Sequence, residues 1–186
     1  MVPKSTEFNE EVNAVYPLSH GQRALWFLQQ LDPSSTAYNV ARAVRICTRL
    51  NVAVFRQALQ AAVSRHPALR TTFADTDTGP VQQVHAEQAA CFHIEDASAW
   101  SPAQLDQRLS EETYRPCDLE RGPLLRIFLF RQSDDNFVLL LVAHHIICDL
   151  WSMVLLMSEV PLLYQAALTG APSLLRPLRT RSPAPG

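Results

Sequence analysis

The sequence predicts an α/β domain in which helices pack on a mixed β-sheet. Short apolar segments with strand-like patterning alternate along the chain with segments whose apolar residues recur at helical spacing. One unbroken apolar run, residues 138–143, is typical of a central strand that is covered on both faces. The 186 residues are enough for one domain with a substantial hydrophobic core.

Helical spacing of apolar residues, with start signals, predicts four helices, over residues 22–31, 51–65, 102–114 and 150–168. Ser19 is the predicted N-cap of the first helix, and Asp149 that of the last. Ser101 caps the third helix, where the following Pro-Ala-Gln allows a capping box. Pro161 lies inside the last helix and removes one backbone hydrogen bond, so we expect a kink or break near Val160.

Apolar alternation and flanking turn residues predict six strands, over residues 38–47, 69–73, 81–84, 91–94, 124–130 and 137–143. The last two are separated by the turn residues 132–136 and form a predicted hairpin. Residues 1–14 are expected to be a flexible leader. Residues 171–186 hold four prolines and several arginines without periodicity, which predicts a disordered tail.

Composition excludes several classes of partner. A net charge of -2 provides no basic surface for nucleic acid or for an anionic membrane. The longest apolar run is far shorter than the roughly 20 residues of a membrane span, and the N-terminus lacks the apolar stretch of a signal peptide. The four scattered cysteines form no CxxC motif and are expected to be buried thiols, which indicates a cytoplasmic protein.

Two adjacent histidines end the central apolar run. Residues 138–152 read VLLLVAHHIICDLWS, in which His144 and His145 are followed by Asp149. Alternation along a strand places the two imidazoles on opposite faces, so only one of them is expected to face a given cleft. The stretch therefore predicts a strand, a histidine pair, a tight turn and a capped helix.

Four segments resemble, in order and in approximate spacing, the motifs of condensation domains from nonribosomal peptide synthetases. Three family positions are changed, because Pro67 replaces a glutamate, Cys117 a phenylalanine and Leu150 a glycine. The segments are SHGQRALWFLQQLDPSSTAYN (19–39), RHPALRTTF (65–73), CDLERGPLLRIFLFR (117–131) and HHIICDLWS (144–152).

The resemblance implies a fold and a function. Condensation domains are V-shaped pairs of lobes that each resemble chloramphenicol acetyltransferase, and residues 15–170 resemble the N-terminal lobe alone. The family forms an amide or ester bond between a thioester donor and an acceptor. Both substrates are carried on the 4'-phosphopantetheine arms of carrier proteins, so the implied partners are carriers, and the lobe itself needs no bound cofactor.

The resemblance also assigns roles to the site residues. His145 matches the histidine that faces the tunnel between the lobes, as a base or as a positioner of the amine, and an imidazole ordinarily titrates near pH ~6.5. His144 matches the first histidine, for which we expect a mainly structural role. Asp149 matches a structural aspartate that pairs with an upstream arginine, for which Arg65 is the first candidate and Arg70 the second.

Leu150 is the main departure from the family pattern. Glycine at this position lets the backbone approach the reacting carbonyl, and its N–H can help to hold developing charge. Leucine retains the N–H but adds a side chain and disfavours positive φ. The substitution indicates either a narrower tunnel or lost catalysis.

Other readings of the site have less support. A metal site built from His144, His145 and Cys148 is disfavoured, because the histidines diverge and no second ligand pair follows. A serine hydrolase is disfavoured because the chain contains no GxSxG. Two hypotheses remain: a catalytic lobe completed by a missing C-terminal lobe or by self-association, and a non-catalytic truncated remnant or carrier-docking module.

Overall fold

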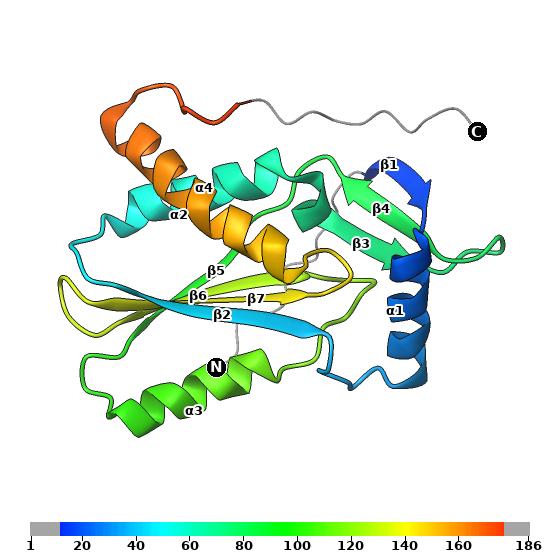
Figure 1. Cartoon of the computed structure of the whole chain (residues 1–186), viewed down its shortest axis with the longest axis horizontal. Helices are drawn as coiled ribbons and strands as arrows, with labels where there is room; N and C mark the ends of the chain where they lie inside the picture. The colour runs from blue at the N-terminus through cyan, green and yellow to red at the C-terminus, as the bar shows by residue number, and fades with distance from the viewer. Residues whose placement is uncertain (1–11, 177–186) are drawn as a thin grey trace.

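The structure is a computed structural model, and it describes residues 12–176. A four-stranded sheet has the strand order β2-β7-β6-β5, and a three-stranded sheet has the order β1-β4-β3 (Figure 1). In the larger sheet β5 and β6 pair in parallel and the other neighbours pair antiparallel, so this sheet is mixed. The strands are β1 Val12–Pro17, β2 Asn39–Ile46, β3 Thr71–Ala74, β4 Val81–His85, β5 Cys91–Asp96, β6 Leu125–Arg131 and β7 Phe137–His144.

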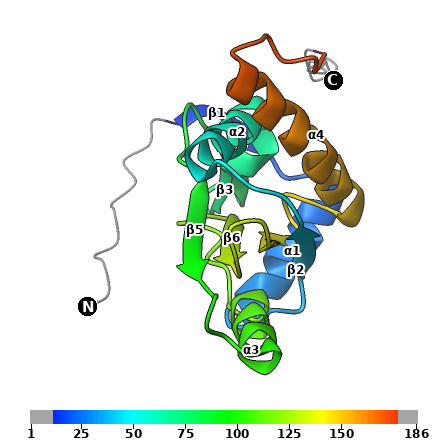
Figure 2. The ribbon, with the colours of Figure 1, turned by 90° about the vertical axis from the view of Figure 1, so that its left-hand side faces the viewer.

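Four α-helices surround the sheets in the described part of the chain: α1 His20–Leu31, α2 Val52–Arg65, α3 Pro102–Thr113 and α4 Leu150–Thr169. Helices α2 and α4 cover one face of the larger sheet and α3 covers the other (Figures 1 and 2). Helix α1 lies beside the smaller sheet (Figure 1). These layers confirm the predicted α/β class with a mixed sheet and packed helices.

Three helices have the N-caps that the sequence predicts, although α1 starts at His20, two residues before the predicted start. Ser19 and Ser101 each accept a hydrogen bond from the third helical residue, and the side chain of that glutamine bonds back to the serine N–H. Asp149 accepts the backbone N–H of Ser152 at the start of α4. Each cap satisfies backbone donors that have no partner within the helix.

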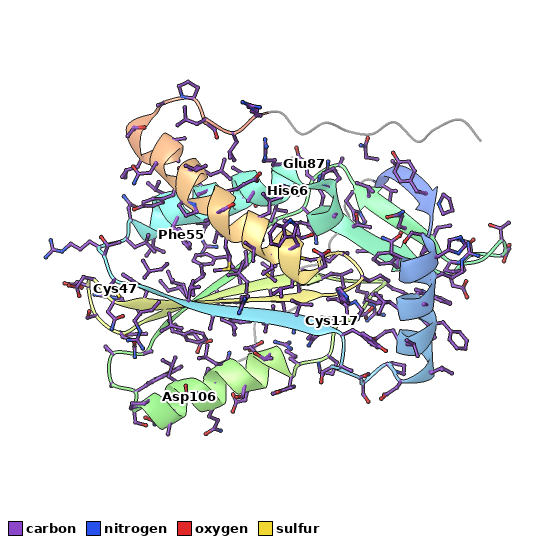
Figure 3. All side chains as sticks on the ribbon, viewed as in Figure 1. Cys47, Phe55, His66, Glu87, Asp106 and Cys117 are labelled. Atoms are coloured by element: carbon purple, nitrogen blue, oxygen red, sulfur yellow. The ribbon has the colours of Figure 1, made fainter. Side chains whose placement is uncertain are left out.

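Strand β7 forms the centre of the core, and every one of its residues is buried. Its two sets of alternating side chains belong to different apolar clusters. Leu139 and Leu141 face α2 and α4, in the layer that also holds Phe55 (Figure 3), whereas Leu140 and Val142 face α3. The continuous apolar run is therefore the consequence of a strand with helices on both sides.

One predicted strand begins differently. A short 3-10 turn, Pro67–Arg70, occupies the first part of the predicted strand 69–73, and β3 starts only at Thr71. Proline favours the first position of a helical turn, since its fixed φ suits the turn and its missing N–H is not needed there. Pro67 therefore delays the strand.

The two ends of the chain also differ in part. The predicted leader, residues 1–14, overlaps β1, which starts at Val12 and pairs antiparallel with β4, while residues 1–11 lie outside the described residues. Residues 171–176 of the predicted disordered tail contain no helix or strand, and residues 177–186 lie outside the description.

Helix α4 continues through Pro161 without the predicted break. By length and composition this helix could cross a membrane, with a mean hydropathy of 1.3 over its most apolar window. Its Met153 and Val160 are buried in the main core, and its Glu159 carboxylate forms an ion pair with Arg65. Helix α4 is thus packed against the domain, and its apolar composition alone is weak support for a membrane span.

Candidate active site

The candidate site lies in the turn between β7 and α4. The backbone N–H of His144 donates to the carbonyl of Leu124 at 2.9 Å, and that of His145 donates to the carbonyl of Tyr38 at 2.8 Å. The N–H of Ile147 then turns back to the carbonyl of His144 at 3.1 Å. The first two bonds hold the backbone of the histidine pair to neighbouring segments, and the third closes the turn after it.

His144 is enclosed, with 1% of its surface exposed. Its Nδ1 lies 3.2 Å from the backbone N of Ile146, so Nδ1 accepts this hydrogen bond and the ring proton resides on Nε2. Burial lowers the pKa of His144 to about 4, and the nearby charges of His145 and Arg126 act in the same direction. A neutral, enclosed imidazole that bonds to its own turn supports the expected structural role.

His145 is exposed, in contrast to its neighbour. Its Nδ1 lies 3.3 Å from the carbonyl oxygen of Cys148. A carbonyl only accepts, so this contact requires the proton on Nδ1 and leaves the lone pair on Nε2. In the uncharged form of the ring, this tautomer leaves Nε2 free to accept a proton or a hydrogen bond.

Asp149 serves α4 rather than the histidine. Its carboxylate accepts the N–H of Ser152 at 2.7 Å, and its side chain is exposed. Hydrogen bonding from Ser152 holds the pKa of this carboxyl below its ordinary value, and the charge of His145 acts in the same direction. The structure therefore assigns Asp149 the N-cap role of the two that its sequence position suggested.

The predicted ion pair of Asp149 is corrected by the structure. Arg65 donates from Nε to the Glu159 carboxylate at 3.2 Å, and Arg70 donates to the backbone carbonyl of His85. Within residues 12–176, neither arginine pairs with Asp149. Asp149 is ten residues before Glu159 on α4, roughly 15 Å along the axis, and only Glu159 lies beside the end of α2.

Glu159 and His66 complete this second polar cluster. The Nε2 atom of His66, which Figure 3 shows at the end of α2, lies 2.7 Å from the same Glu159 oxygen that Arg65 contacts. The Glu159 side chain is 8% exposed, so its charge requires these partners. Helical spacing placed Glu159 on α4, but the sequence contained no signal for a partner 94 residues away.

Arg126, for which the sequence predicted no role, lies on the same face of the sheet as His144. Its guanidinium is buried and donates to the Glu112 carbonyl in the last turn of α3 and to the Arg115 and Pro116 carbonyls after it, at 2.8–3.3 Å. It follows Leu125 at the end of the GPLLR segment, where a charge within an apolar strand was the available signal. It satisfies one carbonyl of the last turn of α3 and two carbonyls of the segment that follows the helix.

Leu150 fits the backbone without strain. It is the first residue of α4, and no residue other than glycine has a positive φ within residues 12–176. Its side chain is 53% exposed beside the histidine turn, and the adjacent Trp151 is 80% exposed. The leucine therefore adds apolar surface at the site without distorting the turn.

Cys148 is unsuited to binding a metal. Burial raises the pKa of its thiol to about 11, whereas the thiolate is the form that coordinates metals. Within the described part of the chain, no group of three His, Cys, Asp or Glu side chains is arranged to hold a metal ion.

The fold and the turn together define a class of protein, an α/β lobe that presents one free imidazole nitrogen at the end of a buried strand. A model of the condensation-domain family matches residues 12–179, so the chain belongs to the condensation domains. Its relatives show that this is the condensation-domain family of nonribosomal peptide synthetases.

Two relatives are similar at 39% identity. They are chondramide synthase cmdD from Chondromyces crocatus, over 87% of this chain and 4% of the synthase, and a linear gramicidin synthase polypeptide from Brevibacillus parabrevis, over 83% and 2%. The chain therefore spans only a small part of the synthetases that it matches.

Two solved structures have the same fold. The starter condensation domain of the rhizomide synthetase RzmA has a TM-score of 0.82 at 27% identity, covering 88% of this chain and 40% of that chain. A four-domain nonribosomal peptide synthetase bound to AMP and glycine has a TM-score of 0.78 at 26% identity, covering 87% and 12%. This 186-residue chain thus corresponds to less than half of a condensation domain.

Proposed function

We propose that this chain is the histidine-bearing lobe of a condensation domain that forms amide bonds between carrier-bound substrates. The observation that carries this proposal is the exposed His145, whose Nδ1–H is engaged by the Cys148 carbonyl so that Nε2 is free. Family membership supplies the reaction class.

The imidazole suits aminolysis of a thioester. The acceptor amine attacks the thioester carbonyl carbon, a C–N bond forms and the C–S bond breaks. Nε2 of His145 accepts the amine proton or holds the amine by a hydrogen bond, and the proton finally resides on the released thiol. His144 keeps the turn in place, and Asp149 starts α4.

The substrates arrive on phosphopantetheine arms of carrier proteins, and the lobe contributes the imidazole rather than a bound cofactor. Both carriers belong to the cytoplasmic synthetase of which this lobe is a part. The function therefore requires two docking events and the remainder of the condensation domain.

The remainder of the domain packs, in this proposal, against the first half of α4. Four large apolar side chains are exposed there, Leu150, Trp151, Val154 and Leu155, next to the exposed His145. An apolar patch beside a reactive group is typical of an interface that closes over the site. A second lobe there would form the other wall of a tunnel.

A carrier-docking module without catalysis is the second candidate. Its support is a groove of about 570 Å³ between β1, α1 and the turn before β4, lined by Tyr16, Trp26 and Phe27 together with Arg23. Phe27 and the nearby Leu31 are more than half exposed. The leucine at position 150 adds to this reading, because the family has glycine there.

The test is a condensation assay that combines the chain with the remaining lobe of a related domain and with two loaded carriers. If the chain is catalytic, His145→Ala lowers turnover at least about a hundredfold relative to the natural chain. A hundredfold is the lower end of what a general base contributes. His93→Ala, which removes an exposed imidazole from β5, is the control and leaves turnover unchanged. Carrier binding with no turnover by the natural chain supports the docking module instead.

A further inference from the structure

Gln22 takes part in two sets of hydrogen bonds. As the third residue of α1 it completes the capping box, since its Oε1 accepts the N–H of Ser19 at 3.0 Å. Its Nε2 faces away from the cap, at 3.4 Å from the carbonyl oxygen of Ile146 and 3.4 Å from Oε1 of Gln82. One amide group thus joins the start of α1, strand β4 and the histidine turn.

Ile146 is the residue that follows His145, so its carbonyl belongs to the turn that presents the imidazole. The other polar contacts of this turn are made by backbone groups or by its own side chains, such as the Ile146 N–H to Nδ1 of His144. Within the described residues, Gln22 is the side chain from a distant element that hydrogen-bonds to the turn.

We propose that Gln22 is a positioning residue for His145. By holding the Ile146 carbonyl, it limits rotation of the peptide groups between His145 and Cys148, whose carbonyl binds the His145 ring. Loss of the amide donor therefore loosens the Nδ1 contact and lets the proton distribute over both ring nitrogens. The relevance of this effect to turnover rests on the proposed function, but the geometric effect does not.

Helix α3 provides a matched comparison. Gln104 occupies the same position of an equivalent capping box, and its Oε1 accepts the N–H of Ser101 at 2.7 Å. Its amide N–H group makes no contact with the histidine turn. Substituting either glutamine therefore removes the same half of a capping box, the bond from the serine N–H to the glutamine side chain. Only the change at Gln22 also removes the contacts with Ile146 and Gln82.

The experiment is NMR of the histidine rings in the full 186-residue chain with ¹⁵N-labelled histidine, above pH 7, for Gln22→Met and Gln104→Met. The methionine variants add no charge, and each loses the glutamine half of its capping box while the serine cap remains. In Gln22→Met we expect the His145 population with the proton on Nε2 to rise about five-fold relative to the natural chain, equivalent to one net hydrogen bond of about 1 kcal/mol. Gln104→Met leaves this ratio unchanged.

Gln22→Glu is the second variant, and it separates loss of the Ile146 contact from a folding defect caused by loss of the cap. Glutamate retains the cap acceptor that a capping box uses but has no N–H for the Ile146 carbonyl. The same redistribution in Gln22→Glu supports the proposal, and an unchanged His145 ring in either Gln22 variant overturns it. The ring signals are measured without substrate, so this outcome is independent of whether the domain condenses anything.

In the assembled domain the same variants separate positioning from binding. We expect Gln22→Met to lower kcat several-fold with little change in KM for either carrier, and Gln104→Met to change neither. A rise in KM with unchanged kcat contradicts the proposal, because it indicates a role in carrier binding rather than in orienting the imidazole.

Discussion

Two adjacent histidines in this protein have opposite environments. His144 is the last residue of β7 and is enclosed between the sheet and its neighbours, whereas His145 is the first residue of the turn and is exposed. The two histidines differ in exposure because β7 ends between them. The enclosed ring supports the turn, and the exposed ring is available for chemistry.

The role of Asp149 can be tested by two substitutions. Asp149→Asn retains an oxygen acceptor for the Ser152 N–H, so we expect the unfolding midpoint to stay within about 1 °C. Asp149→Ala loses the cap and lowers the midpoint by about 3 °C. The measurement is thermal unfolding by circular dichroism. A loss in Asp149→Asn as large as that in Asp149→Ala would indicate that the charge itself is needed, as in the ion pair that the structure does not contain.

His144 makes stability depend on pH. Its folded pKa is about 4, below its value of ~6.5 in the unfolded chain, so between these values the unfolded chain binds more protons. The free energy of unfolding therefore falls as pH drops from about 6.5 to about 4, by roughly 3 kcal/mol in total. Above pH ~6.5 this group has no further effect.

The measurement is urea unfolding at several pH values between 4 and 7.5, with His144→Asn as the comparison. We expect the variant to be less stable at pH 7 but to have a flatter pH dependence in this window. The carboxyl of Asp149 has a lowered pKa, so its contribution is lost only at pH values below the window. Equal slopes for the two proteins would show that His144 does not cause the dependence.

At the scale of elements, β7 and β1 are opposites. β7 is bonded to β2 and β6 along both edges and is buried throughout. Within residues 12–176, β1 pairs with β4 alone and is largely exposed. A strand with two bonded neighbours loses its hydrogen bonds only when the sheet opens, whereas a strand at an edge can separate locally.

Amide hydrogen exchange should therefore differ strongly between these strands. We expect the amides of β7 to exchange at the rate of global unfolding and those of β1 at least about tenfold faster. Mass spectrometry of peptides from the two strands in the natural chain measures both rates in one sample. Equal protection of β1 and β7 would contradict the edge position of β1.

The connection between α2 and α4 is also a property of elements. Arg65 and His66 end one helix, and both reach Glu159 in the middle of the other. The pairing gives these charged side chains partners where two otherwise apolar helix faces meet. It also explains why the charge of Asp149, at the far end of α4, is left to the solvent.

At the scale of the whole molecule, an exposed apolar surface on α4 lies beside the candidate site. Four exposed apolar residues lie in the first turns of α4, between Leu150 and Leu155, and large side chains of this kind seldom gather on the surface of a monomeric protein. In the isolated 20.8 kDa chain this surface is open to a second copy.

We therefore expect the isolated chain to self-associate through α4. Light scattering coupled to gel filtration should give a mass above that of one chain, and Trp151→Ser with Leu155→Ser should restore the monomer mass. Trp151 is 80% and Leu155 47% exposed, so the free energy of unfolding should change by less than about 0.5 kcal/mol for Trp151→Ser and by about 1 kcal/mol for Leu155→Ser. Leu174→Ser, at an 88% exposed residue outside α4, is the control and should leave the mass unchanged. A natural chain that is already monomeric contradicts this prediction.

Much of the fold was predictable because its signals are local. The caps at Ser19, Ser101 and Asp149 depend on residues within one turn. The apolar run before His144 predicts that both faces of β7 are covered. The motif order predicted the family, which the comparison with known domains confirmed. The exposed turn of His145 follows from the same stretch of sequence.

The remaining features depend on partners far apart in the chain. Strand β1 is stabilised by backbone pairing with β4, Arg65 by Glu159, and the histidine turn by Gln22. None of these pairs can be recognised from periodicity or from a local motif in the sequence. The sequence neighbours of a side chain do not determine which distant group will lie beside it. By itself the sequence determined the class and the family, and it predicted that His145 is the histidine available for chemistry. Only the tertiary structure decided which charges pair, because ion pairs and long-range hydrogen bonds form only after the elements have packed.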